Sequence, residues 1–157
     1  MSVNTEQAPV SQNDRIMAAL GHSTAILPMM GVIAPIIIWA TQKDKSEYVA
    51  FQALQAIAYQ FIMILIWFAG MALYMGSFFL TFLTIPLSGH MDTFPVFFFV
   101  PFLVMGGMMF AMLCFVIYGL VAAVMALQGR DFRYIILGNQ LKKYLAKPNQ
   151  NASIPQA

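Results

Sequence analysis

Long apolar runs separated by short charged segments dominate this chain. From Tyr48 to Gln128 the only formal charge is Asp92, and a second charge-free run extends from Leu20 to Gln42. A charged side chain inside a bilayer costs several kcal/mol, so charge-free apolar runs of this length are typical of membrane spans. The pattern predicts an all-α, polytopic integral membrane protein with three hydrophobic helical segments.

The first hydrophobic segment, about residues 20–41, contains Pro28, Gly31 and Pro35. Proline removes a helix hydrogen bond and bends the chain. We therefore expect this segment to be either a broken helix that crosses the membrane or a re-entrant hairpin. Irregular backbone at membrane depth persists only where protein or water satisfies it.

The second segment begins near Tyr48 and is expected to run at least to Gly70 or Met75. The third is expected from about Pro101 to Leu127. Between them, residues 78–102 are rich in phenylalanine and interrupted by proline and glycine. Because one helix through this whole apolar run would far exceed the bilayer thickness, we expect residues 78–102 to form a connector at the membrane surface.

Polar tails and one helical domain make up the predicted domain organisation. Residues 1–13 and 147–157 are expected to be flexible tails, and residues 14–146 a helical transmembrane domain. Ser11 and Asp14 have the spacing of a helix cap, which predicts a helix start at residue 13 or 14. Residues 132–146 show an apolar face flanked by basic residues, which predicts a C-terminal amphipathic helix on the membrane surface.

Composition and charge narrow the class further. The chain is 61% hydrophobic and 9% charged, too few charges for a soluble domain. Nothing indicates a nucleic-acid surface, and one cysteine cannot form an internal disulfide.

Lysine and arginine flank the spans at Lys43, Lys45 and the C-terminal region. By the positive-inside rule, these regions lie on the cytoplasmic side. We expect a multi-pass protein of the bacterial inner (cytoplasmic) membrane, with three crossings and a cytoplasmic C-terminus. The predicted membrane-surface basic residues are Arg130, Arg133, Lys142 and Lys143.

One face of the second segment is unusually polar. An unpaired amide in lipid is costly, so glutamines on a membrane helix require partners. They are explained either by interhelical hydrogen bonds or by a polar groove that serves a substrate path. Gln52 is expected to be accessible near the interface and Gln55 protected. The residues of this face are Tyr48, Gln52, Gln55 and Tyr59, with Gln60 beside them.

The third segment carries a row of small residues that predicts a helix-packing seam. The seam comprises Gly107, Ala111, Cys114, Tyr118 and Ala122. A methionine stripe that includes Met108 lies on the other face and is best explained as adaptable packing rather than copper binding. No metal, catalytic or cofactor motif is present, so we expect a non-enzymatic protein without a cofactor. His22 is expected to be a structural hydrogen-bond donor.

Three segments carry a family resemblance: Gly21-His22-Ser23 before the broken run, residues 43–60, and Gly129-Arg130-Asp131-Phe132-Arg133-Tyr134. In the order and spacing of these three segments, the chain resembles the small bacterial membrane proteins of the domain of unknown function 4870. Those proteins are similar to the Tic twenty-like component of the plastid protein translocon. The resemblance implies a helical fold with few spans and no catalytic role.

The leading functional hypothesis is a scaffold or accessory subunit of a membrane complex. The alternative is a small transport or protein-translocation element. Expected partners are the lipid bilayer and other membrane proteins or a second copy, with no nucleic acid and no small-molecule substrate.

Overall fold

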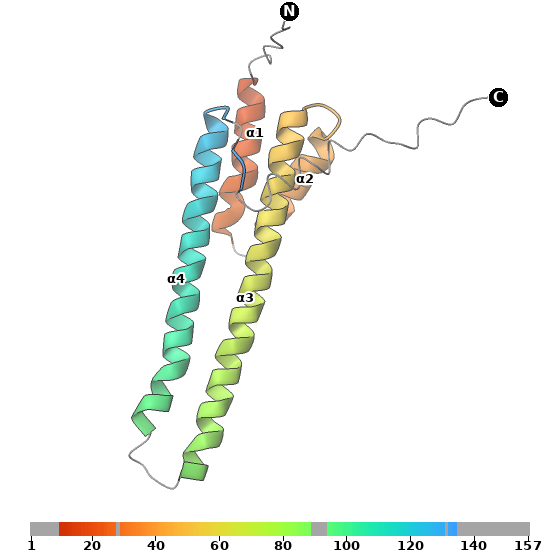
Figure 1. Ribbon diagram of the computed structural model, residues 1–157. Coiled ribbons are helices and arrows are strands. Elements are labelled where there is room, and N and C mark those ends of the chain that lie inside the picture. The colour runs from red at the N-terminus through yellow and green to blue at the C-terminus, as the bar shows by residue number, and fades with distance from the viewer. Residues whose placement is uncertain (1–9, 28, 89–93, 131, 135–157) are drawn as a thin grey trace, which may run out of the picture.

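The protein is a bundle of helices dominated by two long ones (Figure 1). The computed structural model describes residues 10–27, 29–88, 94–130 and 132–134, with the backbone alone for residues 85–88 and 94–97. The predicted all-α class is confirmed for these residues, which contain no strand. The elements are α1 (Gln12–Ser23), the short 3-10 helix η1 (Thr24–Ile26), α2 (Ile33–Gln42), α3 (Glu47–Ser88) and α4 (Phe94–Leu127).

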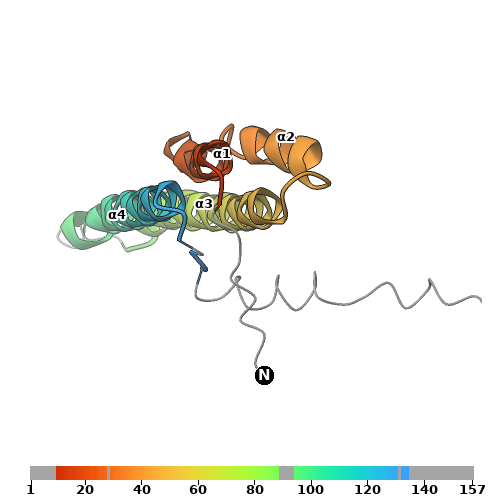
Figure 2. The same cartoon turned by 90° about the horizontal axis from the view of Figure 1, so that it is seen from above.

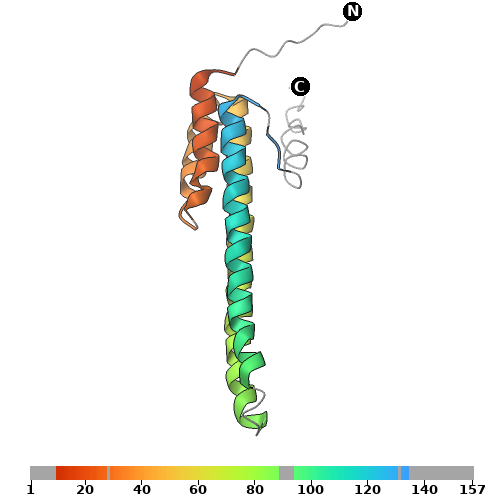
Figure 3. The same ribbon diagram turned by 90° about the vertical axis from the view of Figure 1, so that its left-hand side faces the viewer.

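The helices form two layers of unequal length. α3 and α4 lie side by side and antiparallel, and α1 and α2 pack on one face of this pair, close to the end where α3 begins and α4 ends (Figures 1 and 3). Seen from above, the extended residues 132–134 lie on the opposite face of the α3–α4 layer (Figure 2). This end of the pair is therefore covered from both sides, whereas at the other end the described residues belong to α3 and α4 alone.

Local sequence signals fix the start of α1 and the end of α4. The Ser11 hydroxyl accepts a hydrogen bond from the Asp14 backbone N–H at 3.1 Å, so the predicted cap is present and α1 begins at Gln12. After α4, Gly129 has φ +71° and the Arg130 N–H donates to the Met125 carbonyl. This pattern is a Schellman ending, which favours glycine at the left-handed position.

The first hydrophobic segment is broken, as predicted. α1 ends at Ser23, one turn of 3-10 helix follows, and the chain reverses into α2. Gly31 lies at the reversal, where a Cβ atom would collide with the carbonyl oxygen of Thr24 and come within 2.8 Å of the Gln60 side-chain oxygen. Only glycine lets the reversing chain approach these oxygens so closely.

The predicted surface connector over residues 78–102 is wrong. α3 continues without interruption through the phenylalanine-rich stretch to Ser88, and α4 starts at Phe94 rather than near Pro101. Bilayer thickness does not limit how far backbone hydrogen bonding continues, and Gly76 costs the helix only about 1 kcal/mol relative to alanine. The Ser77 hydroxyl is satisfied by donating to the Tyr74 carbonyl.

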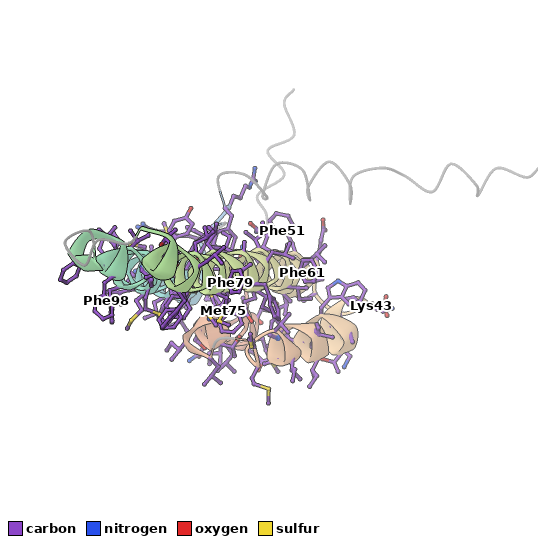
Figure 4. The ribbon with its side chains drawn as sticks, turned by 90° about the horizontal axis from the view of Figure 1, so that it is seen from below. Lys43, Phe51, Phe61, Met75, Phe79 and Phe98 are labelled. Atoms are coloured by element: carbon purple, nitrogen blue, oxygen red, sulfur yellow. The ribbon has the colours of Figure 1, made fainter. Side chains whose placement is uncertain are left out.

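Small side chains form the core, and large apolar side chains cover the surface. Most of the buried apolar residues are alanines, with Ala18 and Ala126 among the fully buried ones. Phe61, Phe79 and Phe98 are exposed and project from the long helices (Figure 4). Close backbone approach through small residues, with large apolar groups outside, is typical of helices that pack in lipid.

Among the described residues, two helical stretches are long and apolar enough to cross a membrane, Glu47–Thr84 with 38 residues and Phe98–Leu127 with 30. At 1.5 Å per residue they measure about 57 and about 45 Å, against a hydrocarbon core of about 30 Å. α2 has only 10 residues.

Candidate functional site

The polar face predicted on the second segment lies inside the protein, at the end where the bundle is four helices thick. Gln52 and Gln55 are each 0% exposed and Gln60 is 3% exposed. The expectation that Gln52 would be accessible near the membrane surface is therefore wrong, because α1 and residues 132–134 cover it from two sides. We call the buried polar junction the set His22, Gln52, Gln55, Gln60 and Tyr134.

His22, on α1, connects α3 to the segment after α4. Its Nε2 lies 3.0 Å from Gln52 Oε1, and its Nδ1 lies 3.1 Å from the Tyr134 hydroxyl. The Gln52 amide nitrogen donates to the Phe132 carbonyl at 3.3 Å, so Oε1 is the atom that faces the imidazole. We assign Nε2–H as the donor to Gln52 and the Tyr134 hydroxyl as the donor to Nδ1, which leaves the ring neutral and both nitrogens satisfied.

Gln55 holds residues 132–134 through two backbone hydrogen bonds. Its amide nitrogen donates to the Phe132 carbonyl at 3.1 Å, and its amide oxygen accepts from the Tyr134 N–H at 3.1 Å. A side-chain amide can therefore pair with an extended segment as a neighbouring strand would. These two bonds satisfy a buried backbone that has no helix or sheet of its own.

Tyrosine rings pack around the same point. The rings of Tyr59 and Tyr134 stack with centroids 4.3 Å apart and planes 8° apart. The Tyr59 hydroxyl donates to the Phe115 carbonyl on α4 at 2.7 Å. Burial raises the pKa of Tyr134, so its hydroxyl stays protonated and available to donate to His22.

Gln60 and Tyr48 extend the polar face to the two ends of the junction. The Gln60 amide nitrogen donates to the Thr24 hydroxyl at 2.9 Å, which fixes the reversal between α1 and α2. The Tyr48 hydroxyl donates to the Ala126 carbonyl at 3.2 Å, at the last turn of α4. The face predicted on α3 thus contacts α1, the reversal, α4 and residues 132–134.

The chemistry of the junction is that of a hydrogen-bonded joint. Among the described residues, no buried side-chain nitrogen or oxygen lacks a hydrogen-bond partner. The same residues contain no group of three or more His, Cys, Asp or Glu side chains that could hold a metal ion. The junction therefore joins four parts of the fold and offers no free polar atom for catalysis or ligation.

The predicted seam on α4 is packed within the monomer only toward its C-terminal end. Ala122 is fully buried, but Cys114 is exposed and a Cβ atom on Gly107 would meet nothing within 4 Å. Gly119 replaces them in the packed row, since a Cβ there would lie 2.7 Å from Ala25 Cβ. Met108, which the sequence placed opposite the seam, lies against Gly70 on α3.

Of the predicted basic residues, Arg130 is exposed at the end of α4 and Arg133 lies within the extended segment. Lys142, Lys143 and most of the predicted amphipathic helix fall outside the described residues. Sequence reasoning missed Phe132, Tyr134 and Thr24 as partners of the glutamines. For Phe132 and Tyr134 the only signal was the Gly129–Tyr134 motif, and its position after the last span did not predict which residues it would contact.

Comparison with known proteins assigns the chain to a family. No curated protein and no solved structure matches it. The model of the MamF and MmsF family, described as the magnetosome magnetite crystal formation protein family, matches residues 13–141. This match overturns the resemblance to the domain of unknown function 4870 and its Tic twenty-like relatives, because the motifs that suggested it lie inside the matched range. The chain belongs to the MamF and MmsF family of magnetosome magnetite crystal formation proteins.

Proposed function

We propose that this chain is a non-enzymatic integral membrane protein of the magnetosome, an accessory subunit or scaffold that acts in magnetite crystal formation. Membership of the family supports the cellular role. The observation that supports the non-enzymatic assignment is the hydrogen bonding of the junction: among the described residues, every buried side-chain nitrogen and oxygen has a hydrogen-bond partner. A site whose donors and acceptors are consumed in this way stabilises one arrangement of helices.

The protein crosses the membrane twice, through α3 and α4. These are the two stretches with sufficient apolar length, whereas α2 is too short to span. The start of α1, the loop after α2 and the end of α4 meet at one end of the bundle, where the Ser46 hydroxyl donates to Asp14 at 3.1 Å. Lys43, Lys45 and Arg130 gather there, so this end is cytoplasmic by the positive-inside rule. The start of α1 thus lies on the cytoplasmic side of the membrane. The three-crossing arrangement would instead place it on the opposite side.

Transport along a polar groove on α3 has less support. The glutamines that suggested it are buried and hydrogen-bonded to His22, Thr24 and the 132–134 backbone, rather than facing an open path. A substrate path would need polar groups free to exchange partners along the route.

Localisation of the chain and deletion of its gene test the cellular role. In the bacterium that encodes the chain, a tagged copy should co-purify with magnetosome membranes and resist alkaline carbonate extraction. Deletion should change the size or shape of the magnetite crystals, and the intact gene should restore them. Normal crystals in the deletion strain, with the tagged chain elsewhere in the cell, would contradict the assignment.

Cysteine labelling tests the topology. In a Cys114→Ser background, expressed in a host without magnetosomes so that the chain inserts into the cytoplasmic membrane, cysteines at Gln12 and Lys43 should both be protected from an impermeant thiol reagent added outside spheroplasts. A cysteine at Asp92, between the two spans, should react. Labelling of Gln12→Cys together with protection of Lys43→Cys would restore three crossings.

A further inference from the structure

We propose that the protein is a membrane wedge that accumulates where the bilayer curves strongly with its convex face on the side of Lys43 and Arg130. The inference rests on the proposed membrane insertion. It adds that α1, η1 and α2 form a hairpin embedded in one leaflet only. The partner is the acyl-chain region of that leaflet.

The outer surface of the α1–α2 layer is apolar. Ile33, Ile37 and Leu27 are 50%, 56% and 57% exposed, and further exposed residues of the same layer are Leu20, Ile26 and Met30. No formal charge occurs between Leu20 and Gln42. On α3, Phe61 follows Gln60, the residue that bonds the reversal, and it is 58% exposed. Since the long helices present such exposed apolar side chains to lipid, the hairpin at the same depth meets lipid as well.

The backbone of the reversal is satisfied well enough to lie at membrane depth. The Leu27 N–H donates to the Thr24 carbonyl at 2.9 Å, and the Gly31 N–H donates to the Leu27 carbonyl at 2.8 Å. The Thr24 hydroxyl donates to the Gly21 carbonyl and accepts from Gln60. Non-helical backbone is tolerated in the hydrocarbon region only when its polar groups find partners in this way.

The dimensions of the hairpin match one leaflet. α1 with 12 residues and α2 with 10 residues measure about 18 and about 15 Å, and half of the hydrocarbon core is about 15 Å. The reversal contacts Gln60, which lies 13 residues after Glu47 (60 − 47), or about 20 Å along α3. Beyond that level, the part of the chain that the structure describes consists of α3 and α4 alone (Figure 3).

The shape that follows is wide in one leaflet and narrow in the other. Four helices lie in the leaflet next to the charged end and two in the opposite leaflet. Each helix has a diameter of about 10–12 Å with its side chains, so the cross-section roughly doubles between the leaflets. Such a body fits best where the wide leaflet is stretched over a convex surface. A vesicle or bud that faces the cytoplasm provides this surface for a protein whose charged end is cytoplasmic.

Reconstitution of the full chain tests the wedge. The Cys114→Ser, Lys43→Cys protein, labelled with a dye, is inserted into phosphatidylethanolamine and phosphatidylglycerol vesicles of a wide range of diameters. An impermeant quencher separates molecules with residue 43 outside from those with it inside. On the smallest vesicles, outward molecules should be denser by roughly two-fold or more than on the largest, and inward molecules should be depleted.

Substitution of the lipid-facing surface supplies the matched control. Leu27→Gln, Ile33→Gln and Ile37→Gln together should abolish the dependence on diameter, because the hairpin can no longer stay in the acyl chains. The corresponding triple valine variant should keep it. The two sets change the same exposed positions and leave the junction intact.

Each outcome of these experiments either supports or overturns the wedge. Equal density at all diameters in both orientations overturns the wedge, as does enrichment of both orientations or an unchanged dependence in the glutamine variant. If the glutamine variant does not insert, the comparison of the two orientations of the parent protein is decisive. Release of the parent protein by carbonate contradicts membrane insertion itself, which distinguishes failure of the proposed function from failure of the wedge.

Discussion

Gln55→Leu should release the segment after α4 while the helices remain packed. The leucine fills a similar volume but removes both hydrogen bonds to residues 132–134. The Phe132 carbonyl keeps the bond from Gln52, whereas the Tyr134 N–H is left buried without its acceptor. An orphaned buried donor costs about 1–3 kcal/mol, so we expect about 2 kcal/mol.

Trypsin cleavage after Arg133 measures this release. When opening is fast compared with cleavage, the rate follows the population of the open segment. A factor of ten corresponds to about 1.4 kcal/mol, so a cost of about 2 kcal/mol should accelerate cleavage by roughly 30-fold. The assay uses the detergent-solubilised full chain and quantifies this bond by mass spectrometry.

Gln128→Leu is the matched control, because Gln128 is exposed just after α4. It should change the rate of cleavage after Arg133 by less than two-fold, about 0.4 kcal/mol. An unchanged rate in Gln55→Leu, or an equal acceleration in both variants, would refute the view that Gln55 holds the segment.

Three further substitutions probe other contacts, each measured by denaturant-induced unfolding in detergent. Tyr134→Phe should cost about 1–2 kcal/mol, because His22 Nδ1 loses its donor while the ring stack persists; unchanged stability in Tyr134→Phe, with a loss only in Tyr134→Ala, would show that the hydroxyl is irrelevant. Gly31→Ala should cost about 1–3 kcal/mol through collision with the Thr24 carbonyl, whereas Gly107→Ala, in open space inside α4, should be neutral or stabilise by up to about 1 kcal/mol, and equal effects would contradict the packing at Gly31. Gly129→Ala should cost about 1–2 kcal/mol because alanine is strained at φ +71°, and a neutral result would argue against the observed ending of α4.

Apolar pattern and local chemistry were sufficient to predict much of this fold. Helical class, the break around Gly31 and the cap at Ser11 follow from interactions within a few residues of sequence, and each is present. The end of the second segment was misplaced because membrane thickness was used to limit a helix. Residues 78–88 continue α3 through backbone bonds that do not depend on what surrounds them.

The junction was only half predictable. Periodicity along α3 correctly placed Gln52 and Gln55 on one face, and the cost of bare amides in lipid required partners for them. The partners could not be predicted, because the bond from His22 to Tyr134 joins positions 112 residues apart. Only part of the predicted seam on α4 packs within the described residues, where Ala122 and Tyr118 join the core. Helical spacing identifies a row of small residues, but the rotation of α4 against α1 decides how much of that row packs.

The sequence distance across the junction imposes an order on biosynthesis. In the proposed two-crossing topology, Gln52 and Gln55 enter the membrane with α3 long before Phe132 and Tyr134 have been synthesised, so their amides must spend that interval with temporary partners. The last described residues of the chain complete the hydrogen bonding of one of its first membrane helices. A ribosome that stalls, or a message that ends, before residue 132 would therefore leave α3 and α4 in the bilayer with unsatisfied glutamine amides. Membrane quality-control proteases can distinguish such a chain from the finished protein.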